Sequence, residues 1–176
     1  MLGTLMFATK VAMAALPNIH LVGMLTMVYT LVFRKKALIP LYLYIFLEGL
    51  YGGFSAYWLP YLYVWAVLWG VTVLLPRDMS KRAKYIVYPL VCCLHGLLFG
   101  TLFAPGYALI AGLSLKGMLA WIVSGLPFDA LHGAGNLAAG FLIVPLSELL
   151  ARLSGKINRE TPQPEENTKA PDSAEK

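Results

Sequence analysis

The chain has 176 residues, of which 59% are hydrophobic and only 13% are charged. Together with a mean hydropathy of +0.67, this composition excludes an ordinary water-soluble enzyme of this size. The net charge of +5 does not indicate a nucleic-acid partner, because most basic residues lie between or after apolar blocks, as in the cytoplasmic loops of membrane proteins. The sequence therefore predicts an all-α, multi-pass membrane protein.

Six apolar blocks are predicted as membrane helices, since a span needs about 20 apolar residues, and fewer where neighbouring helices help. In chain order they are Leu2–Leu16, Ile19–Phe33, Ala37–Phe54, Leu59–Leu75, Tyr85–Phe103 and Phe128–Leu150. A further apolar stretch, Tyr107–Gly125, contains several glycines and Lys116. We expect this stretch to form an irregular, partly helical outer segment, with a seventh span as the alternative.

Basic clusters indicate how these helices are oriented. The clusters Arg34–Lys36, Arg77–Lys84 and Arg152 onward follow the second, fourth and sixth blocks. The positive-inside rule predicts that all three are cytoplasmic, which places both termini inside and three connections outside. The membrane domain is expected to cover residues 1–153. Residues 154–176 are predicted to be a disordered cytoplasmic tail, because the stretch from residue 156 onward has many charges, three prolines and no aromatic residue.

Polar side chains that fall within apolar blocks need a partner or a function, because burying them in a membrane is costly. In this topology the outer leaflet holds most of them: Asn18, His20, Glu48, Asp129, His132 and Asn136. Asp129, His132 and Asn136 follow a helical spacing and share one face. They can cap the helix and bind neighbouring helices, or they can form a ligand pocket. Their concentration on one leaflet favours the pocket.

Aromatic residues gather in the outer connection after the third apolar block and in the helix that follows it. Most are expected to form an interfacial belt, but Trp58, Tyr61 and Trp65 lie at helical spacing and can stack on a planar ligand. No phosphate-binding glycine motif is present, so the chain is not expected to hydrolyse nucleotides. Asp129 and His132 alone are too few for a metal site, and no metal or other cofactor is predicted.

Several segments, taken in order, resemble the S components of energy-coupling factor transporters. The residues that carry the resemblance are Leu16-Pro17-Asn18-Ile19-His20-Leu21-Val22, Leu47-Glu48-Gly49, Trp58–Trp65, and Ser124-Gly125-Leu126-Pro127-Phe128-Asp129 followed by His132 and Asn136. The similarity extends from Ala12 to Leu153 and includes the plan of six spans with both ends inside.

The resemblance implies a non-enzymatic transport subunit of a prokaryotic plasma membrane. Such a subunit captures a vitamin or a related micronutrient near the outer surface. It then associates with a transmembrane coupling protein and two cytoplasmic ATPases, and topples in the membrane to release its cargo. Separate ATPases account for the missing nucleotide motif. Ala8 and Ala12 have the spacing of the small-residue face with which the first helix of this family docks on the coupling protein.

Two other hypotheses belong to different classes. A small membrane enzyme could use Asp129, His132 and Glu48, for example on a lipid, and it would turn over substrate without partner proteins. A structural membrane scaffold would instead need Asp129 and His132 for stability alone. The predicted ligand-binding residues are Asn18, His20, Glu48, Trp58, Tyr61, Trp65, Asp129, His132 and Asn136.

Overall fold

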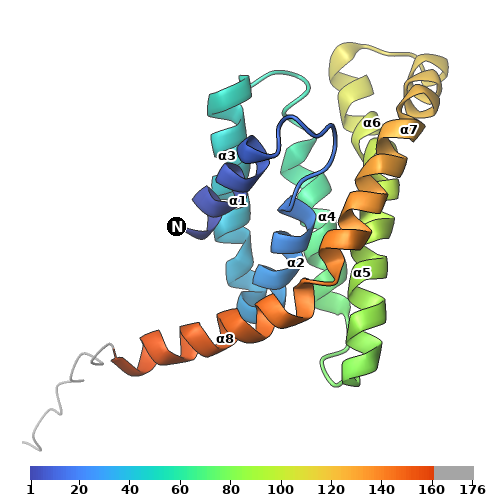
Figure 1. Ribbon diagram of the computed structural model, residues 1–176. Coiled ribbons are helices and arrows are strands. Elements are labelled where there is room, and N and C mark those ends of the chain that lie inside the picture. The colour runs from blue at the N-terminus through green and yellow to red at the C-terminus, as the bar shows by residue number, and fades with distance from the viewer. Residues whose placement is uncertain (161–176) are drawn as a thin grey trace, which may run out of the picture.

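The computed structural model describes residues 1–160, with side chains as far as Gly155, and helices are the only regular secondary structure in this part of the chain (Figure 1). The prediction of an all-α fold is therefore confirmed for it. The helices are α1 (Leu2–Ala12), α2 (Val22–Phe33), the 3-10 turn η1 (Arg34–Ala37), α3 (Leu38–Gly52), α4 (Tyr61–Leu74), α5 (Lys81–Leu97), α6 (Phe99–Ala111), α7 (Leu115–Gly140) and α8 (Ile143–Glu160).

The stretch Tyr107–Gly125, predicted to be irregular and partly helical, is helical for most of its length. It forms the end of α6 and the beginning of α7. The two helices are separated at Gly112, which has a φ of 68°, a left-handed conformation that glycine adopts without steric cost. Ser114 begins α7 by accepting a hydrogen bond from the Gly117 N–H at 3.2 Å, as N-cap serines commonly do.

Other predicted limits also differ from the observed ones. The predicted fifth helix is divided at Leu98, and the predicted sixth helix starts at Leu115 and is divided after Gly140. The first four predicted helices are each three or four residues shorter in the structure, because turns take up their ends. α8 continues to Glu160, so residues 154–160 are helical where a disordered tail was expected. The rest of that predicted tail lies outside the described residues.

Few of the helices are long enough to cross a membrane on their own. The stretch Lys81–Ala111 has sufficient length and apolar character, and Leu115–Gly140 with Ile143–Gly155 qualifies as a pair bent by 53°. α1 and α4 are shorter apolar helices. Length and composition thus support one or two spans in the described residues, and the arrangement with six spans stays a prediction.

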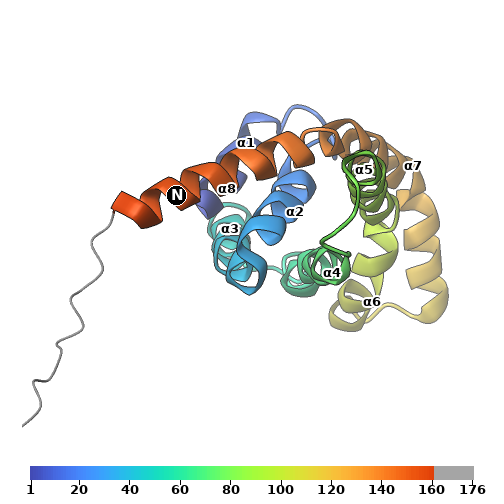
Figure 2. The same cartoon turned by 90° about the horizontal axis from the view of Figure 1, so that it is seen from below.

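α2 is the central helix of the bundle. The nine consecutive residues Val22–Thr30 are all buried, so this helix packs against neighbours on every side, as a helix that is apolar all round can. Figure 2 shows α2 and α4 between the pair α1 and α3 and the group α5, α6 and α7. The buried hydroxyls of Thr26 and Thr30 donate to the carbonyls of Val22 and Thr26, at 2.8 and 2.6 Å. Their polar groups are therefore satisfied within the helix itself.

Close packing of α5 against α7 depends on glycines. A Cβ atom on Gly140 would lie 2.6 Å from the Cα of Pro89, and one on Gly96 would lie 2.9 Å from the Cα of Gly133. Small residues let two helix backbones approach in this way, and they are common where membrane helices pack. The contact holds α7, with Asp129 and His132, in a fixed register against α5.

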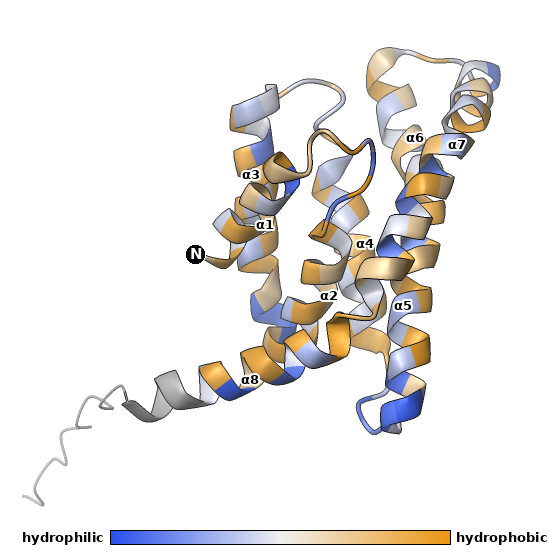
Figure 3. Ribbon diagram, in the orientation of Figure 1, coloured by the Kyte–Doolittle hydropathy of each residue, from blue (hydrophilic) through white to orange (hydrophobic). Residues whose placement is uncertain are grey.

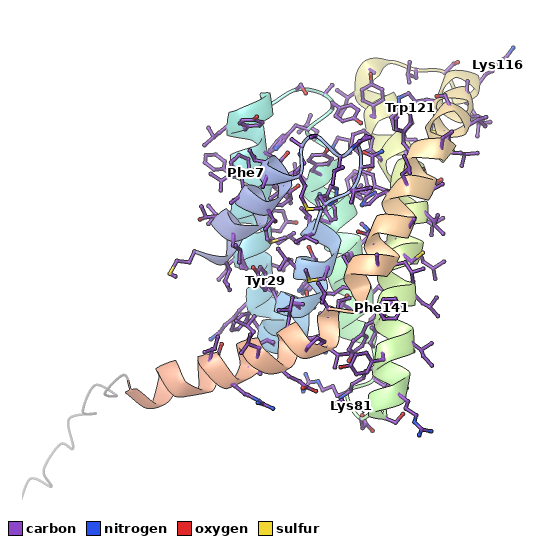
Figure 4. The ribbon with its side chains drawn as sticks, viewed as in Figure 1. Phe7, Tyr29, Lys81, Lys116, Trp121 and Phe141 are labelled. Atoms are coloured by element: carbon purple, nitrogen blue, oxygen red, sulfur yellow. The ribbon has the colours of Figure 1, made fainter. Side chains whose placement is uncertain are left out.

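The two ends of the bundle differ in character. One end carries the connection between α4 and α5, with Lys81 just after it, together with η1 and α8, and its connection is coloured strongly hydrophilic (Figures 3 and 4). The other end carries the connections 13–21, 53–60 and 112–114, between α1 and α2, α3 and α4, and α6 and α7. Lys116 and Trp121 lie at that end (Figure 4).

Candidate functional site

A cavity of about 520 Å³ lies at the end formed by the three connections. It is bounded by the end of α1, by the connection that follows it, and by α3, α4, α6 and α7. Seven of the nine predicted ligand-binding residues line it: Asn18, His20, Glu48, Tyr61, Trp65, Asp129 and His132. Residues from distant parts of the sequence therefore converge on one space, whose volume is typical of small-molecule sites.

Glu48 forms the carboxylate side of this cavity together with a lysine. It lies on α3 and is only 7% exposed. Its Oε2 atom accepts a hydrogen bond from the ammonium group of Lys10, whereas Oε1 is buried without a partner. Lys10, near the end of α1, also lines the cavity, although sequence reasoning assigned it no role. One oxygen of a buried carboxylate is thus left free to accept a hydrogen bond from a ligand.

Asp129 is held by the beginning of a neighbouring helix. Its two carboxylate oxygens accept from the backbone N–H of Gly100, at 3.0 and 3.1 Å. Gly100 is the second residue of α6, and the first N–H groups of a helix have no partner within it and favour negative charge. A Cβ on Gly100 would lie 2.4 Å from Oδ2 of Asp129. Asp129 therefore stabilises the beginning of α6. The capping alternative had expected it to stabilise the start of its own helix.

Two histidines meet at the inner part of the cavity. The ring centroids of His20 and His132 are 4.8 Å apart, at an interplanar angle of 67°. His20 Nδ1 and His132 Nε2 are both buried without a hydrogen-bond partner. Burial, and after it the nearby Lys10 ammonium, lower the pKa of His20, in the connection before α2, to about 4. His20 is therefore neutral at pH 7.

Aromatic side chains form the remaining wall. Phe103 and Trp121 stack with centroids 5.7 Å apart at 13°, Trp65 and Phe99 lie 5.3 Å apart, and the buried indole N–H of Trp65 has no partner. Sequence reasoning missed Phe99, Phe103 and Trp121. The spacing of Phe99 and Phe103 by one helical turn could have indicated them, whereas Trp121 was hidden in the segment expected to be irregular.

Two predicted residues lie outside the cavity. The indole N–H of Trp58 donates to the carbonyl of Ile45 at 2.8 Å and joins the connection 53–60 to α3. The amide of Asn136 donates to the carbonyl of Cys92 at 3.1 Å and joins α7 to α5. Both therefore connect elements of the fold.

The predicted docking residues are at the surface. Ala8 and Ala12 are both exposed on α1. The opposite side of α1 packs on α3, since a Cβ on Gly3 would lie 2.6 Å from the carbonyl oxygen of Pro40. The small-residue face is therefore not used by the fold of the described residues.

The cavity has the features of a binding site. Five buried polar atoms around it lack partners: His20 Nδ1, Tyr44 Oη, Glu48 Oε1, Trp65 Nε1 and His132 Nε2. In the part of the chain that the structure describes, no hydrogen bond joins Asp129 to His132, and no group of three potential metal ligands occurs. The arrangement can bind a small molecule by hydrogen bonds and aromatic contacts.

No protein-family model matches the chain, and neither the curated proteins nor the solved structures show a significant similarity to it.

Proposed function

We propose that this chain is a membrane-embedded subunit that captures a small molecule in the cavity at its outer end. The observation that carries the proposal is the set of unpartnered polar atoms around the cavity of about 520 Å³. Leaving a buried polar group without a hydrogen bond costs about 1–3 kcal/mol. A ligand that bonds to these atoms removes that cost, so the cavity is suited to an occupant.

Apolar side chains on the outside of the bundle support the membrane location. α5 exposes Ile86, Leu90 and Leu94 to 60%, 49% and 54%, in a continuous stripe along one face. α3 exposes Ile39 and Phe46 to 72% and 51%. Contiguous apolar surface of this kind on several helices favours contact with lipid. The basic residues at the opposite end from the cavity favour the orientation with that end in the cytoplasm.

The chemistry of the cavity indicates the kind of ligand. Two carboxylates, Glu48 and Asp129, face one ammonium group, that of Lys10, so an anionic ligand is disfavoured. The wall that includes Trp65, Phe99 and Phe103 favours an aromatic ring. A planar, non-anionic molecule with hydrogen-bond donors fits both conditions. We therefore expect the ligand to be a vitamin or related micronutrient of this kind.

The resemblance to the S components extends the proposal to partners. In that arrangement a transmembrane coupling protein and two cytoplasmic ATPases supply the energy for uptake. The exposed face of α1 with Ala8 and Ala12 is the surface that we assign to the coupling protein, since small side chains permit close contact between helices. The side chains that line the cavity are then free for the cargo.

Native mass spectrometry of the purified chain tests the proposal directly. We expect a retained small molecule, or a thermal shift with one member of a vitamin panel, in the absence of ATP. Glu48→Gln is expected to weaken binding about tenfold or more, because a hydrogen bond to a charged group contributes about 1.5–3 kcal/mol. Asp78→Asn, at an exposed site in the connection between α4 and α5, is the matched control and should bind normally.

Two results would contradict the proposal. The first is the absence of any retained molecule and of any thermal shift across the panel. The second is turnover of a substrate by the purified chain that is lost in Asp129→Asn, since this would indicate a membrane enzyme.

A further inference from the structure

A second cavity, of about 450 Å³, lies at the basic end of the bundle. It is bounded by the end of α2, the connection between α4 and α5, α5 itself and the first half of α8. Three cationic side chains from three different segments line it: Arg34, Arg77 and Lys84. The ligand cavity described above shares none of these residues, so this is a separate site.

Arg34 is fixed in this position by the fold. Its backbone has a φ of 54°, which is rare for a residue with a side chain and costs energy. Its carbonyl accepts from the indole N–H of Trp69 at 3.0 Å, and its Nη2 donates to the carbonyl of Val73 at 2.6 Å. A guanidinium has five N–H donors. The contact with α4 therefore orients the group and leaves donors available for an anion.

The cations of this cavity are not neutralised by the protein around them. Glu148 is the carboxylate among the lining residues, and no ion pair within 4.0 Å joins it to any of the three cations in the side chains that the structure describes. Tyr88, a residue only 4% exposed, belongs to the same lining. Three cations and one carboxylate leave a net charge of +2, which favours an anionic occupant.

Apolar side chains complete the lining of this cavity, and they distinguish a phospholipid from a free phosphate ion as its occupant. Leu31, Leu75 and Val144 lie beside the cations. From here α8 leaves the bundle at 53° to α7 and extends away from it (Figure 1), with Leu149 and Leu153 exposed to 52% and 48%. A free phosphate ion uses only the cations. A phospholipid uses both kinds of surface, because its phosphate and its acyl chains are joined.

We propose that Arg34, Arg77 and Lys84 bind the phosphate of an anionic phospholipid of the cytoplasmic leaflet, beside the base of α8. The inference uses the membrane location proposed above, but not the capture of a ligand in the first cavity. Basic pockets between helices at the cytoplasmic side bind such headgroups. The bound lipid would link α2, the connection between α4 and α5, and α8 at the membrane surface.

Native mass spectrometry of the full chain, extracted from membranes that contain phosphatidylglycerol and phosphatidylcholine in equal amounts, tests the inference. We expect selective retention of phosphatidylglycerol. Arg34→Gln and Lys84→Gln should each reduce it about fivefold, because one basic residue near an anionic surface contributes about 1 kcal/mol. Lys36→Gln and Lys81→Gln are the matched controls, since both residues are exposed and neither lines the cavity; they should retain the lipid normally.

Several outcomes would overturn the inference. These are equal retention of the two lipids, an equal loss in the control variants, and displacement of the lipid by millimolar inorganic phosphate, which would assign the site to free phosphate. Lys84→Gln decides the question if Arg34→Gln fails to fold, because the amine of Lys84 makes no hydrogen bond to the described residues. Binding to the first cavity, measured on the same variants, separates this result from the proposed function.

Discussion

The ion pair of Lys10 and Glu48 leads to a prediction about stability that can be worked out from the structure. Glu48 is only 7% exposed, and Lys10 is 30% exposed. The ammonium group is the partner that balances the charge of a buried carboxylate, whose other oxygen has none. Replacing the lysine by methionine leaves that carboxylate buried and unpaired.

The size of the effect follows from the burial of the two groups. Breaking a fully buried pair by removing one partner costs about 3–5 kcal/mol. Because Lys10 is partly exposed and water screens its charge, we expect about 2–3 kcal/mol for Lys10→Met. The double variant with Glu48→Gln removes both charges together, and it should cost only about 1 kcal/mol, since no unpaired charge remains.

A double-mutant cycle measures this difference. The assay is the free energy of unfolding at pH 7 in mixed micelles, for the original chain, the two single variants and the double variant. We expect a coupling energy of about 2 kcal/mol. For independent sites the stability changes of two substitutions add to within about 0.3–0.5 kcal/mol, so this coupling would be well above that limit. Lys116→Met, at an exposed site that does not line the cavity, is the control and should change stability by at most about 0.5 kcal/mol.

The cycle can also refute the reasoning. If the double variant loses the sum of the two single losses, Lys10 and Glu48 do not form a coupled pair. If Lys10→Met alone has no effect on stability, the carboxylate of Glu48 is hydrated or protonated without the lysine.

Three further predictions concern neighbouring residues. Gly100→Ala should cost about 2 kcal/mol of unfolding free energy and weaken ligand binding, because the added Cβ would lie 2.4 Å from Asp129 Oδ2 and break a charged hydrogen bond. Gly52→Ala, with no atom within 4 Å of the added Cβ, is the control. An equal loss of stability in both variants would contradict the account. Asn136→Leu should lower the melting temperature but leave the ligand Kd within about twofold, since its amide bonds to α5 outside the cavity; a titration that shows a large rise in Kd would refute this. The pKa of His20 is lowered from 6.5 to about 4, so as the pH falls the unfolded chain binds a proton at this histidine before the folded chain does, and stability should decline from pH 6.5 towards pH 4. Unfolding free energies measured at several pH values should show a shallower decline in His20→Gln. An unchanged slope in this variant would contradict the assignment.

The candidate site could be predicted from the sequence to the extent that it depends on polar residues in apolar surroundings. Glu48, Asp129 and His132 stand out because a buried polar group needs a partner. The basic clusters add the information that these residues share the end away from the positive charges. Those two arguments were sufficient to predict five of the lining residues, Asn18, His20, Glu48, Asp129 and His132, and the helical spacing of the aromatic residues added Tyr61 and Trp65.

The helix limits could not be predicted in the same way, because glycine and proline have opposite effects in different surroundings. Gly112 ends a helix, whereas Gly117, Gly125 and Pro127 lie inside α7. A proline within a membrane helix loses one backbone hydrogen bond, and neighbouring helices can compensate for the loss. Packing against α5 and α6 therefore decides the outcome, and local composition does not. Trp121 lines the cavity from the part of α7 that was expected to be irregular, so the sequence did not indicate it.

Position along a helix is harder to infer than the face on which a residue lies. Asp129, His132 and Asn136 share one face of α7, as their spacing predicted. A rise of 1.5 Å for each residue separates the first from the last by about 10 Å, however, and over that distance the facing element changes. Asp129 meets the beginning of α6 at Gly100, whereas Asn136 meets the carbonyl of Cys92 on α5. The same polar stripe therefore borders the cavity at one end and joins two helices at the other, and only the positions of the neighbouring helices distinguish these roles.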